Sequence, residues 1–439
     1  MTAIRRGVAA LVACSLWPAA ATAADDLDSL FDLDKPLAPA EPSGSGLRWS
    51  GYAEAAAAYT YEEPAHWSKL RARFELAANG KLGERAKFKL SGRIDADGAY
   101  ELEDGHYPGP VRRDQRRDLS LREAYIDTSA GDWEFRFGRQ HVVWGEVVGI
   151  FLADVVSARD MREFFLPEFE ALRIPQWAAR AEYFGENSYL ELLWIPVPSY
   201  DEVGKPGADF FPFPLPSDAR VHERKPANSI ENTNWGVRAT HLINGWDLSA
   251  FYYRSLDVSP TLYRISPAPT FELRHDRIRQ IGGTVSKDLG TFVLKGEAVH
   301  THGRSMNTTD PTAPFGLKAS NTFDYIVGVD IPIADRWRFN IQHYGHVISS
   351  HEAAMGVERH ERGLTLLVNR KFGDDVEAEV LLASSIEHKD YMVRPKVAWR
   401  VTPDWRAQVG VDLFGGGQNG LFGRFANRDR VYMELRRWF

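Results

Sequence analysis

The chain has 439 residues, of which 44% are hydrophobic and 26% charged, and it carries a net charge of -7 at neutral pH. Charges of both signs are interspersed, so the sequence offers no basic surface for nucleic acid and predicts no nucleic-acid partner. After residue 23 no segment approaches the ~18 consecutive apolar residues that a membrane-spanning helix needs. This excludes a helical membrane protein but not a membrane β-barrel, whose strands need only ~10 residues of alternating character.

Residues 1–23 have the pattern of a secretory signal peptide. Arg5 and Arg6 form a cationic start, residues 7–16 an apolar core, and Ala21-Thr22-Ala23 a small-residue cleavage site. Lipoprotein processing at Cys14 is an alternative, which the short apolar stretch before this residue disfavours. Since the single cysteine would leave with the signal, we expect no disulfide and no cysteine metal site in the mature protein.

Residues 24–46 are acidic at first and then rich in Pro, Gly and Ser. This composition is typical of an unstructured periplasmic lead. Leu27, Leu30, Phe31 and Leu33 also lie near helical spacing. A short helix that docks on a periplasmic partner or in a pore is therefore the alternative interpretation.

From Leu47 onward the hydrophobic pattern has a period of two. In residues 69–78 and again in 87–97, charged residues alternate with apolar ones. This pattern predicts strands with one wet and one apolar face. The alternating runs number about eighteen: 47–60, 67–79, 84–98, 119–128, 133–140, 174–184, 189–195, 234–243, 246–256, 274–287, 291–300, 321–331, 337–347, 360–371, 376–386, 391–401, 405–414 and 430–439.

The spacing of these runs separates a barrel from a soluble sandwich. Short polar turns such as 129–132, 244–245 and 403–404 alternate with long connections, among them 99–117, 141–173, 196–233, 257–273, 301–320 and 415–428. Periplasmic turns and long extracellular loops alternate in this way in outer-membrane barrels. We therefore predict an all-β fold, in which residues 47–439 form an antiparallel transmembrane barrel of about 16–18 strands embedded in outer-membrane lipid.

Tryptophans mark the ends of several predicted strands. Trp133, Trp246, Trp337 and Trp405 each directly follow a short turn. Barrels in lipid carry such aromatic residues at the membrane interfaces. The placement favours a membrane barrel over a soluble sheet.

Two segments resemble known outer-membrane proteins. The alternating C-terminal strand ends on Phe439 and resembles the signal by which the barrel-assembly machinery recognises its substrates. Residues 119–146, LSLREAYIDTSAGDWEFRFGRQHVVWGE, resemble the strand-turn-strand core of a poorly characterised family of large outer-membrane barrels related to porins and to the alginate-export type. The resemblance implies an outer-membrane location and solute passage.

If the apolar faces meet lipid, the opposite parity faces the lumen and carries many cations. The pore-lining candidates are Lys69, Arg71, Arg73, Lys87, Lys89, Arg93, Arg136, Arg180, Arg238, Arg338, Arg394 and Lys396. Acids such as Glu54 and Asp95 share this face, so the charges could form cross-strand ladders that hold the wall. The Lys and Arg residues could also form rings that favour anionic or polar solutes, and both interpretations can hold at once.

The connection 141–173 is too apolar for a loop in water. We expect it to fold into the lumen, partly as a short helix, and to narrow the pore; an external cap is the alternative. Arg136 and Arg180 are candidates to pair with Asp160 or Glu163. The constriction candidates are Phe151, Arg159, Asp160, Arg162, Glu163, Phe164 and Phe165.

The sequence holds no motif for catalysis or for a cofactor. Nucleophile elbow, phosphate-binding loop and zinc-protease patterns do not occur. His300 and His302, with His343 and His346, are more typical of exposed strand ends than of a metal site. The predicted function is a channel or export conduit for a polar or anionic solute, not an enzyme. The alternatives are an envelope-complex component that recruits periplasmic partners through residues 24–46 and, as a minor one, an outer-membrane hydrolase.

Overall fold

The computed structural model describes residues 46–103, 105–145, 147, 151–216, 218–265, 269–334 and 336–439. The expected signal peptide, Cys14 and the periplasmic lead up to residue 45 lie outside the described residues. Among the described helices, none has the length and apolar character needed to cross a bilayer.

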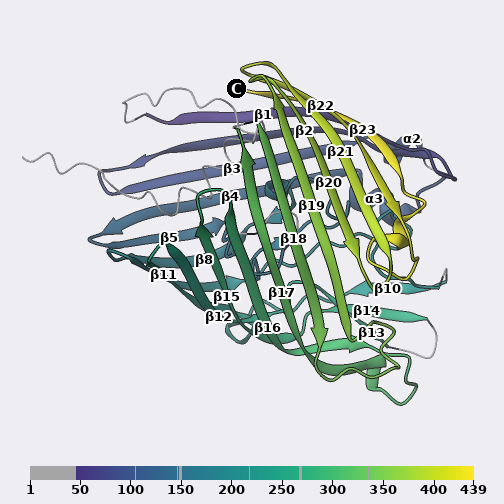
Figure 1. Cartoon of the computed structure of the whole chain (residues 1–439). Coiled ribbons are helices and arrows are strands. Elements are labelled where there is room, and N and C mark those ends of the chain that lie inside the picture. The colour runs from purple at the N-terminus through teal and green to yellow at the C-terminus, as the bar shows by residue number, and fades with distance from the viewer. Residues whose placement is uncertain are drawn as a thin grey trace, which may run out of the picture.

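The fold is a closed antiparallel barrel of 18 strands (Figure 1). In ring order the strands are β1 (Arg48–Thr60), β2 (His66–Leu82), β3 (Ala86–Asp97), β4 (Arg117–Ala130), β5 (Trp133–Gln140), β8 (Gln176–Phe184), β9 (Ser188–Val197), β11 (Asn234–Ile243), β12 (Trp246–Leu256), β15 (Arg277–Asp288), β16 (Val293–Asn307), β17 (Leu317–Ile333), β18 (Trp337–Ile348), β19 (His360–Phe372), β20 (Val376–Ser385), β21 (Asp390–Thr402), β22 (Trp405–Gly415) and β23 (Arg430–Trp438). The predicted fold class and strand count are confirmed.

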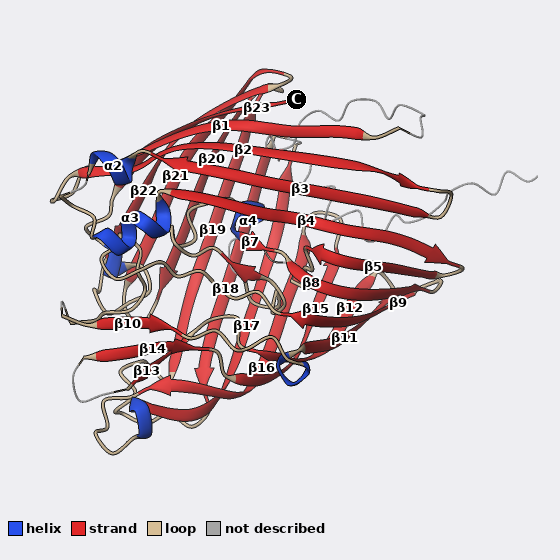
Figure 2. Cartoon of the chain, turned by 180° about the vertical axis from the view of Figure 1, so that it is seen from behind, coloured by secondary structure: helices blue, strands red, loops and turns tan. Residues whose placement is uncertain are grey.

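Each barrel strand pairs with its neighbour along the chain, and β23 pairs with β1 to close the ring. Short turns gather at one end of the barrel and long connections at the other (Figure 2). We call these the turn end and the loop end. The long connections carry the remaining elements: α2 (Ala99–Leu102), α3 (Gly109–Gln115), β6 (Ala158–Arg159), α4 (Phe169–Leu172), β7 (Arg173–Ile174), β10 (Arg220–Glu223), η1 (Ile230–Asn232), β13 (Thr261–Arg264), β14 (Thr270–Arg274), η2 (Pro314–Gly316) and η3 (Gly423–Phe425).

Strands also occur within the predicted connections, 301–320 and 257–273 among them. Most residues of the expected loop 301–320 belong to the paired strands β16 and β17, because β16 runs to Asn307 and β17 begins at Leu317. The register shifts between Thr301 and Arg304, where Gly303 has a φ of 88°, and a bulge of this kind breaks the period-two pattern. The expected loop 257–273 contributes β13 and β14 to a small sheet with β10.

The two faces of the wall follow the predicted parity. On β2 and β3 the apolar Phe74, Leu90 and Ile94 are exposed on the outside. Arg73 and Arg93 alternate with them and are buried on the inside. A wet inner face and an apolar outer face are what a barrel in lipid requires.

The four tryptophans predicted to follow turns are the first residues of β5, β12, β18 and β22. Three of them lie under a cation from a neighbouring strand. Lys287 is 4.7 Å from the Trp246 ring centre, Arg370 is 4.7 Å from that of Trp337, and Arg437 is 5.5 Å from that of Trp405. Such pairs of aromatic ring and cation suit the interface between hydrocarbon and headgroups.

The parity can be tested on one strand with a matched pair of substitutions. Leu90→Arg puts a cation on the exposed apolar face and is expected to cost about 2–4 kcal/mol in a bilayer. Lys89→Leu removes the inward partner of Glu123 and should be tolerated. Heat-modifiable migration of folded protein measures assembly, and equal damage from both changes would contradict the assignment of faces.

Candidate functional site: the barrel lumen

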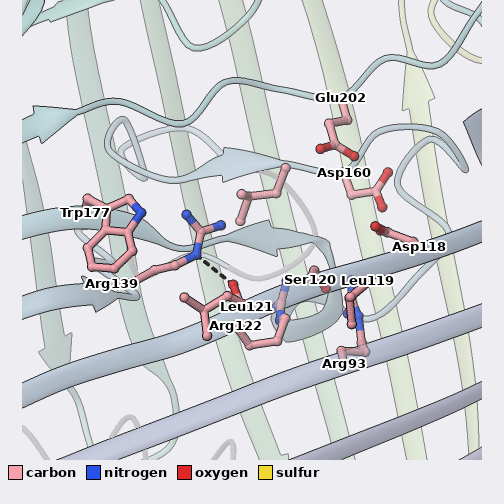
Figure 3. Close-up of a pocket in the computed structure, with 11 residues that line it drawn as sticks. Arg93, Asp118, Leu119, Ser120, Leu121, Arg122, Arg139, Asp160, Trp177 and Glu202 are labelled. Carbon is pink, nitrogen blue, oxygen red and sulfur yellow. Dashed lines mark hydrogen bonds between the residues drawn. The ribbon is translucent and has the colours of Figure 1, made fainter. Parts of the chain in front are cut away.

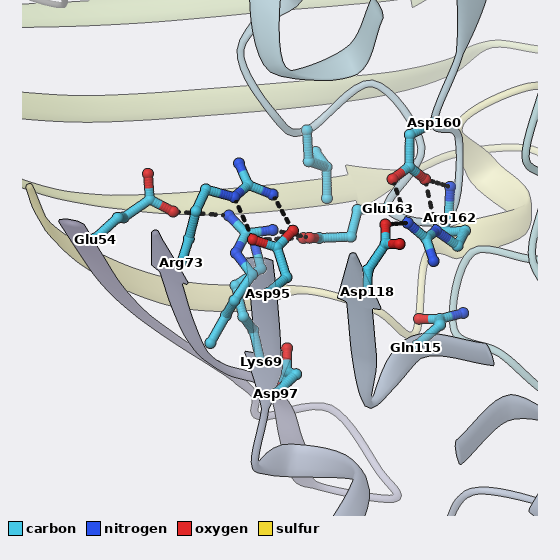
Figure 4. Close-up of polar contacts among 12 residues, drawn as sticks. Glu54, Lys69, Arg73, Asp95, Asp97, Gln115, Asp118, Asp160, Arg162 and Glu163 are labelled. Atoms are coloured by element: carbon cyan, nitrogen blue, oxygen red, sulfur yellow. Dashed lines mark hydrogen bonds and ion pairs between the residues drawn. The ribbon is translucent and has the colours of Figure 1, made fainter. Parts of the chain in front are cut away.

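A ladder of ion pairs runs around the inner face of β23, β1, β2 and β3, and Figure 4 shows its part around Glu54, Arg73 and Asp95. The Glu54 carboxylate on β1 accepts hydrogen bonds from Arg71 on β2 at 3.0 Å and from Arg436 on β23 at 2.8 Å. Arg73 donates two bonds of 2.8 Å to Asp95 on β3. These charge-assisted bonds tie four consecutive strands together across the closure of the barrel.

Most of the predicted pore-lining cations contact a carboxylate. The pairs are Lys69–Glu163, Lys89–Glu123, Arg93–Asp95, Arg136–Asp127, Arg180–Glu182, Arg338–Asp330, Arg394–Asp412 and Lys396–Glu379. Arg238 is half-buried on β11, and Lys87 is exposed near the turn end. Because most of these cations have an acid beside them, the wall is not a uniform basic surface.

The expected pairing of Arg136 and Arg180 with Asp160 or Glu163 is wrong. Asp127 faces Arg136 directly in the β4–β5 register, and Glu182 lies two residues from Arg180 on the same strand. Nearby acids on the wall therefore reach these arginines first. Asp160 instead pairs with Arg162 at 2.6 Å.

The connection between β5 and β8, residues 141–175, crosses the barrel interior. The Glu297 carboxylate on β16 accepts bonds from the backbone N–H of Val147 and Ala153, at 3.0 and 2.8 Å. The Glu163 carboxylate reaches Lys69 and Arg71 on β2 at 2.5 and 3.0 Å. In the ring of 18 strands, β2 and β16 are nine steps apart in either direction, so the two contacts lie on opposite walls.

The contact with the first wall is mainly apolar. Trp144 is fully buried, its ring centre lies 5.2 Å from Phe251 and 5.6 Å from Tyr253, and its indole N–H donates to Glu191 at 3.1 Å. Val142, Ala153, Val155 and Val156 join this cluster and pack on Ala178, Leu193, Ile195 and Val299 of the wall. Burial of this apolar surface holds the segment against β8, β9, β12 and β16.

The contact with the opposite wall is mainly ionic. Besides its two partners on β2, Glu163 contacts Arg430 on β23 at 3.3 Å. Burial alone would raise the pKa of Glu163, but the adjacent Lys69, Arg71 and Arg430 cations hold it well below its usual range. Arg394 donates to the carbonyl of Leu166 at 2.6 Å. Charged groups on three strands thus fix the chain between residues 163 and 166.

The aromatic constriction candidates take two positions. Phe164 is buried in a cluster with Phe210, Phe414 and Phe425 below the loop end. Phe151 is half-buried, with the Arg159 guanidinium 4.4 Å over its ring and the Phe169 ring at 4.5 Å. Phe165 packs partly buried against the same cluster as Phe164. Arg162 contacts Asp118 at 3.1 Å and Glu202 at 3.4 Å, which ties the segment to β4 and to the loop after β9.

The wall partners Glu191 and Glu297 are absent from the candidates chosen by sequence. One signal could have found that side of the lumen. In β9 the residues Leu192–Ile195 are all apolar, so polar and apolar residues no longer alternate there. Leu193 and Ile195 are buried inside the barrel, and Leu192 and Trp194 are exposed outside. Apolar residues at inward parity indicate a wall that something covers.

Among the residues that the structure describes, one cluster has the spacing of metal ligands. His66, His106 and Asp209 place their ligand atoms within 4.8 Å of one another near the loop end. The Asp209 carboxylate, however, also accepts a bond from Tyr107 at 2.7 Å and contacts Arg428 at 3.2 Å. The Arg428 guanidinium already neutralises this carboxylate and would compete with a metal ion for it. The cluster therefore serves to connect β2 with three loops.

Solved structures of outer-membrane barrels resemble this fold. OccAB1 of Acinetobacter baumannii matches with a TM-score of 0.57 and 8% identity, over 91% of this chain and 98% of its own. OccD3 (OpdP) of Pseudomonas aeruginosa matches with a TM-score of 0.53 and 11% identity, over 94% and 96%. OccK8 (OprE) of the same organism matches with 0.52 and 10%, over 90% and 97%. At these identities the likeness concerns the fold.

No curated protein matches the chain. A family model does match: residues 66–362 fit the family described as "Protein of unknown function (DUF1302)". This range begins at the first residue of β2 and includes the segment that crosses the lumen. The match covers more than half of the sequence, and the chain therefore belongs to the DUF1302 family.

Proposed function

We propose that this protein is an outer-membrane channel that passes a polar solute, and that residues 141–173 narrow its lumen. The observation that carries the proposal is the pair of contacts on opposite walls, Glu297 with Ala153 and Glu163 with Lys69. A barrel of about 18 strands encloses a space wide enough for an aqueous channel. A segment fixed across that space divides it and sets the size of what can pass.

The charge on one side of the lumen supports an anionic solute. Arg73, Arg93 and Arg122 lie on β2, β3 and β4, and the acids beside them are Asp95 and Glu75. Asp95 contacts Arg73 at 2.8 Å and Arg93 only at 3.6 Å, and Glu75 faces Arg93 in the strand register. The Arg122 guanidinium donates to the backbone carbonyl groups of Glu170 and Arg173, at 3.2 and 2.8 Å. Where positive side chains outnumber the negative ones near them, the net positive charge attracts anions into a pore.

Planar bilayers test the proposal directly. Purified protein should give discrete conductance steps, and a salt gradient should give a reversal potential of the sign for anion preference. Arg122→Gln should move that potential toward zero. If neither the wild type nor a variant without the crossing segment conducts, the channel function is wrong. A conducting but cation-selective protein would contradict only the preference for anions.

The crossing segment should stay anchored over a wide pH range. Three cations lower the pKa of Glu163 in the folded protein. The ionised carboxylate therefore contributes fully to anchoring at pH values above its pKa in the unfolded chain, ~4.3. This contribution is lost only as the pH falls through the lower pKa of the folded state. We expect wild-type conductance to change little between about pH 8 and pH 5. Glu163→Gln should raise conductance noise throughout, whereas the exposed control Glu134→Gln should not. A transition near neutral pH that Glu163→Gln abolishes would show that its pKa is not lowered.

A further inference from the structure

The barrel wall is incomplete on one side near the loop end. The β4–β5 pairing runs from Ala130 opposite Trp133 to Ala124 opposite Arg139, and β5 ends at Gln140. β4 nevertheless continues to Arg117, still paired with β3 on its other side. Residues 117–123 therefore form an edge with no strand beside it among the described residues, and Figure 2 shows that β4 runs on beyond the end of the shorter β5.

A cavity of about 280 Å³ occupies this gap (Figure 3). Its lining joins the two faces of the wall. Leu119, Leu121 and Trp177 are 79%, 41% and 38% exposed on the outside, whereas Arg93 and Arg122 are 3% and 5% exposed on the inside. One cavity therefore has an apolar rim toward the surroundings of the barrel and a basic wall toward its lumen.

The gap lies at the height expected for the bilayer. Arg139, which lines the cavity, stands six residues beyond Trp133 on β5. That spacing is ~15 Å along the axis at ~3.3 Å per residue and a tilt of ~40°, within an apolar band of ~25 Å. Leu119 also faces Ile94 in the strand register, and Ile94 faces Phe74, so the rim continues the exposed apolar belt.

Polar atoms in the cavity wall are buried without hydrogen-bond partners. The Nε of Arg93 and the hydroxyl of Ser120 both lack a hydrogen bond, although this Nε lies 3.6 Å from the Asp95 carboxylate. An unsatisfied buried guanidinium N–H costs free energy unless a ligand or water completes it. Arg139 donates to the carbonyl of Leu121 at 2.7 Å and so covers part of the open edge of β4.

The three acids that line the cavity contact a cation other than Arg93 or Arg122. Asp118, Asp160 and Glu202 all contact one cation, the Arg162 guanidinium, at 3.1, 2.6 and 3.4 Å. Figure 3 shows these three carboxylates together, away from Arg139 and Trp177. A negatively charged group would therefore bind at the Arg93 and Arg122 side, and an apolar group beside Leu121 and Trp177.

We propose that this gap is a lateral portal that binds an acidic amphiphile, with its carboxylate on Arg93 and Arg122 and its apolar chain against Leu119, Leu121 and Trp177. Such a molecule is anionic at one end and membrane-soluble at the other, so it matches both faces of the cavity. The portal would exchange this molecule between the lumen and the bilayer. The binding site stands on its own geometry and does not require that the axial path conducts.

Photolabelling in phosphatidylcholine nanodiscs tests the portal. The probe is a long-chain fatty acid with a diazirine near its carboxylate, and the matching alcohol is the neutral control. The acid should label peptides that contain residues 118–122 saturably, and the alcohol should label the outer belt without preference. Arg93→Gln should weaken saturation about tenfold through loss of a charge-assisted bond. Arg117→Gln changes an exposed arginine at the start of the neighbouring strand β4 and should have no effect.

A second variant keeps the test decisive if Arg93→Gln does not assemble. Ser120→Phe fills the cavity but retains its charges, and it should also abolish saturable labelling. Equal labelling by acid and alcohol, or unchanged saturation in a folded Arg93→Gln or Ser120→Phe protein, would overturn the portal. Because labelling needs no ion flow, a failure to conduct in planar bilayers would leave this result intact.

Discussion

Replacing residues 142–174 with a Gly-Ser linker of about six residues should raise single-channel conductance roughly threefold or more without preventing barrel assembly. The reason is geometric, since the segment contacts β16 and β2 on opposite walls and so divides the lumen. Entry of large antibiotics into cells should rise in parallel. The strand pairing between Gln140 and Gln176 is retained, so the barrel keeps its register.

Two controls make this experiment specific. Shortening residues 350–358, another loop-end connection, tests whether any trimmed loop has the same effect. Glu163→Gln combined with Glu168→Gln removes carboxylates that contact Lys69, Arg71 and Arg406 but keeps the segment. Conductance in that variant should fluctuate between wild-type and larger values. Unchanged conductance after removal of the whole segment would contradict the constriction.

Glu54→Gln is expected to lower the free energy of unfolding by about 3–5 kcal/mol, because it leaves buried arginines beside a neutral amide. The Glu54 carboxylate is almost fully buried between Arg71 and Arg436. The loss in unfolding free energy should lie near the lower end of this range, because Arg71 still pairs with Glu163 and Arg436 still pairs with Glu434. Urea titration in lipid vesicles, followed by heat-modifiable migration, measures this loss.

The exposed Glu134 near the turn end of β5 provides the matched control for Glu54. Glu134→Gln should change the unfolding free energy by less than about 0.5 kcal/mol. If the two substitutions have equal effects, the ladder across the closure does not stabilise the barrel.

The strands could be predicted from sequence because their signal is local. Alternation repeats every second residue, and β5, β11 and β12 begin and end where the pattern does. The alternating pattern predicts too short a β16–β17 hairpin, because the register shifts near Gly303 and the residues of β16 beyond it do not alternate. A two-residue period cannot be read where neither face is apolar.

The partners of the crossing segment could not be predicted in the same way. Its apolar composition predicted burial, and parity placed Lys69 and Arg394 on the inside. Which carboxylate meets which cation depends on where a long connection runs through three-dimensional space. Glu163 and Arg430 are 267 positions apart in sequence, and no periodicity links them. The gap beside β4 likewise follows from the unequal lengths of two paired strands, which only the register reveals.

The pairing of β1 with β23 has a consequence for how the chain reaches its folded state. Every other barrel pairing joins strands that follow one another in the ring order along the chain, so a growing sheet can extend hairpin by hairpin. The last contact instead joins opposite ends: the N–H and carbonyl of Gly51 bond those of Phe439, each at 3.0 Å. A side chain at residue 51 would collide with the Glu75 carbonyl, since an added Cβ would lie 2.3 Å away. Until that seam forms, the sheet has two open edges that can pair with other chains, and a tag placed directly after Phe439 would sit at the seam itself.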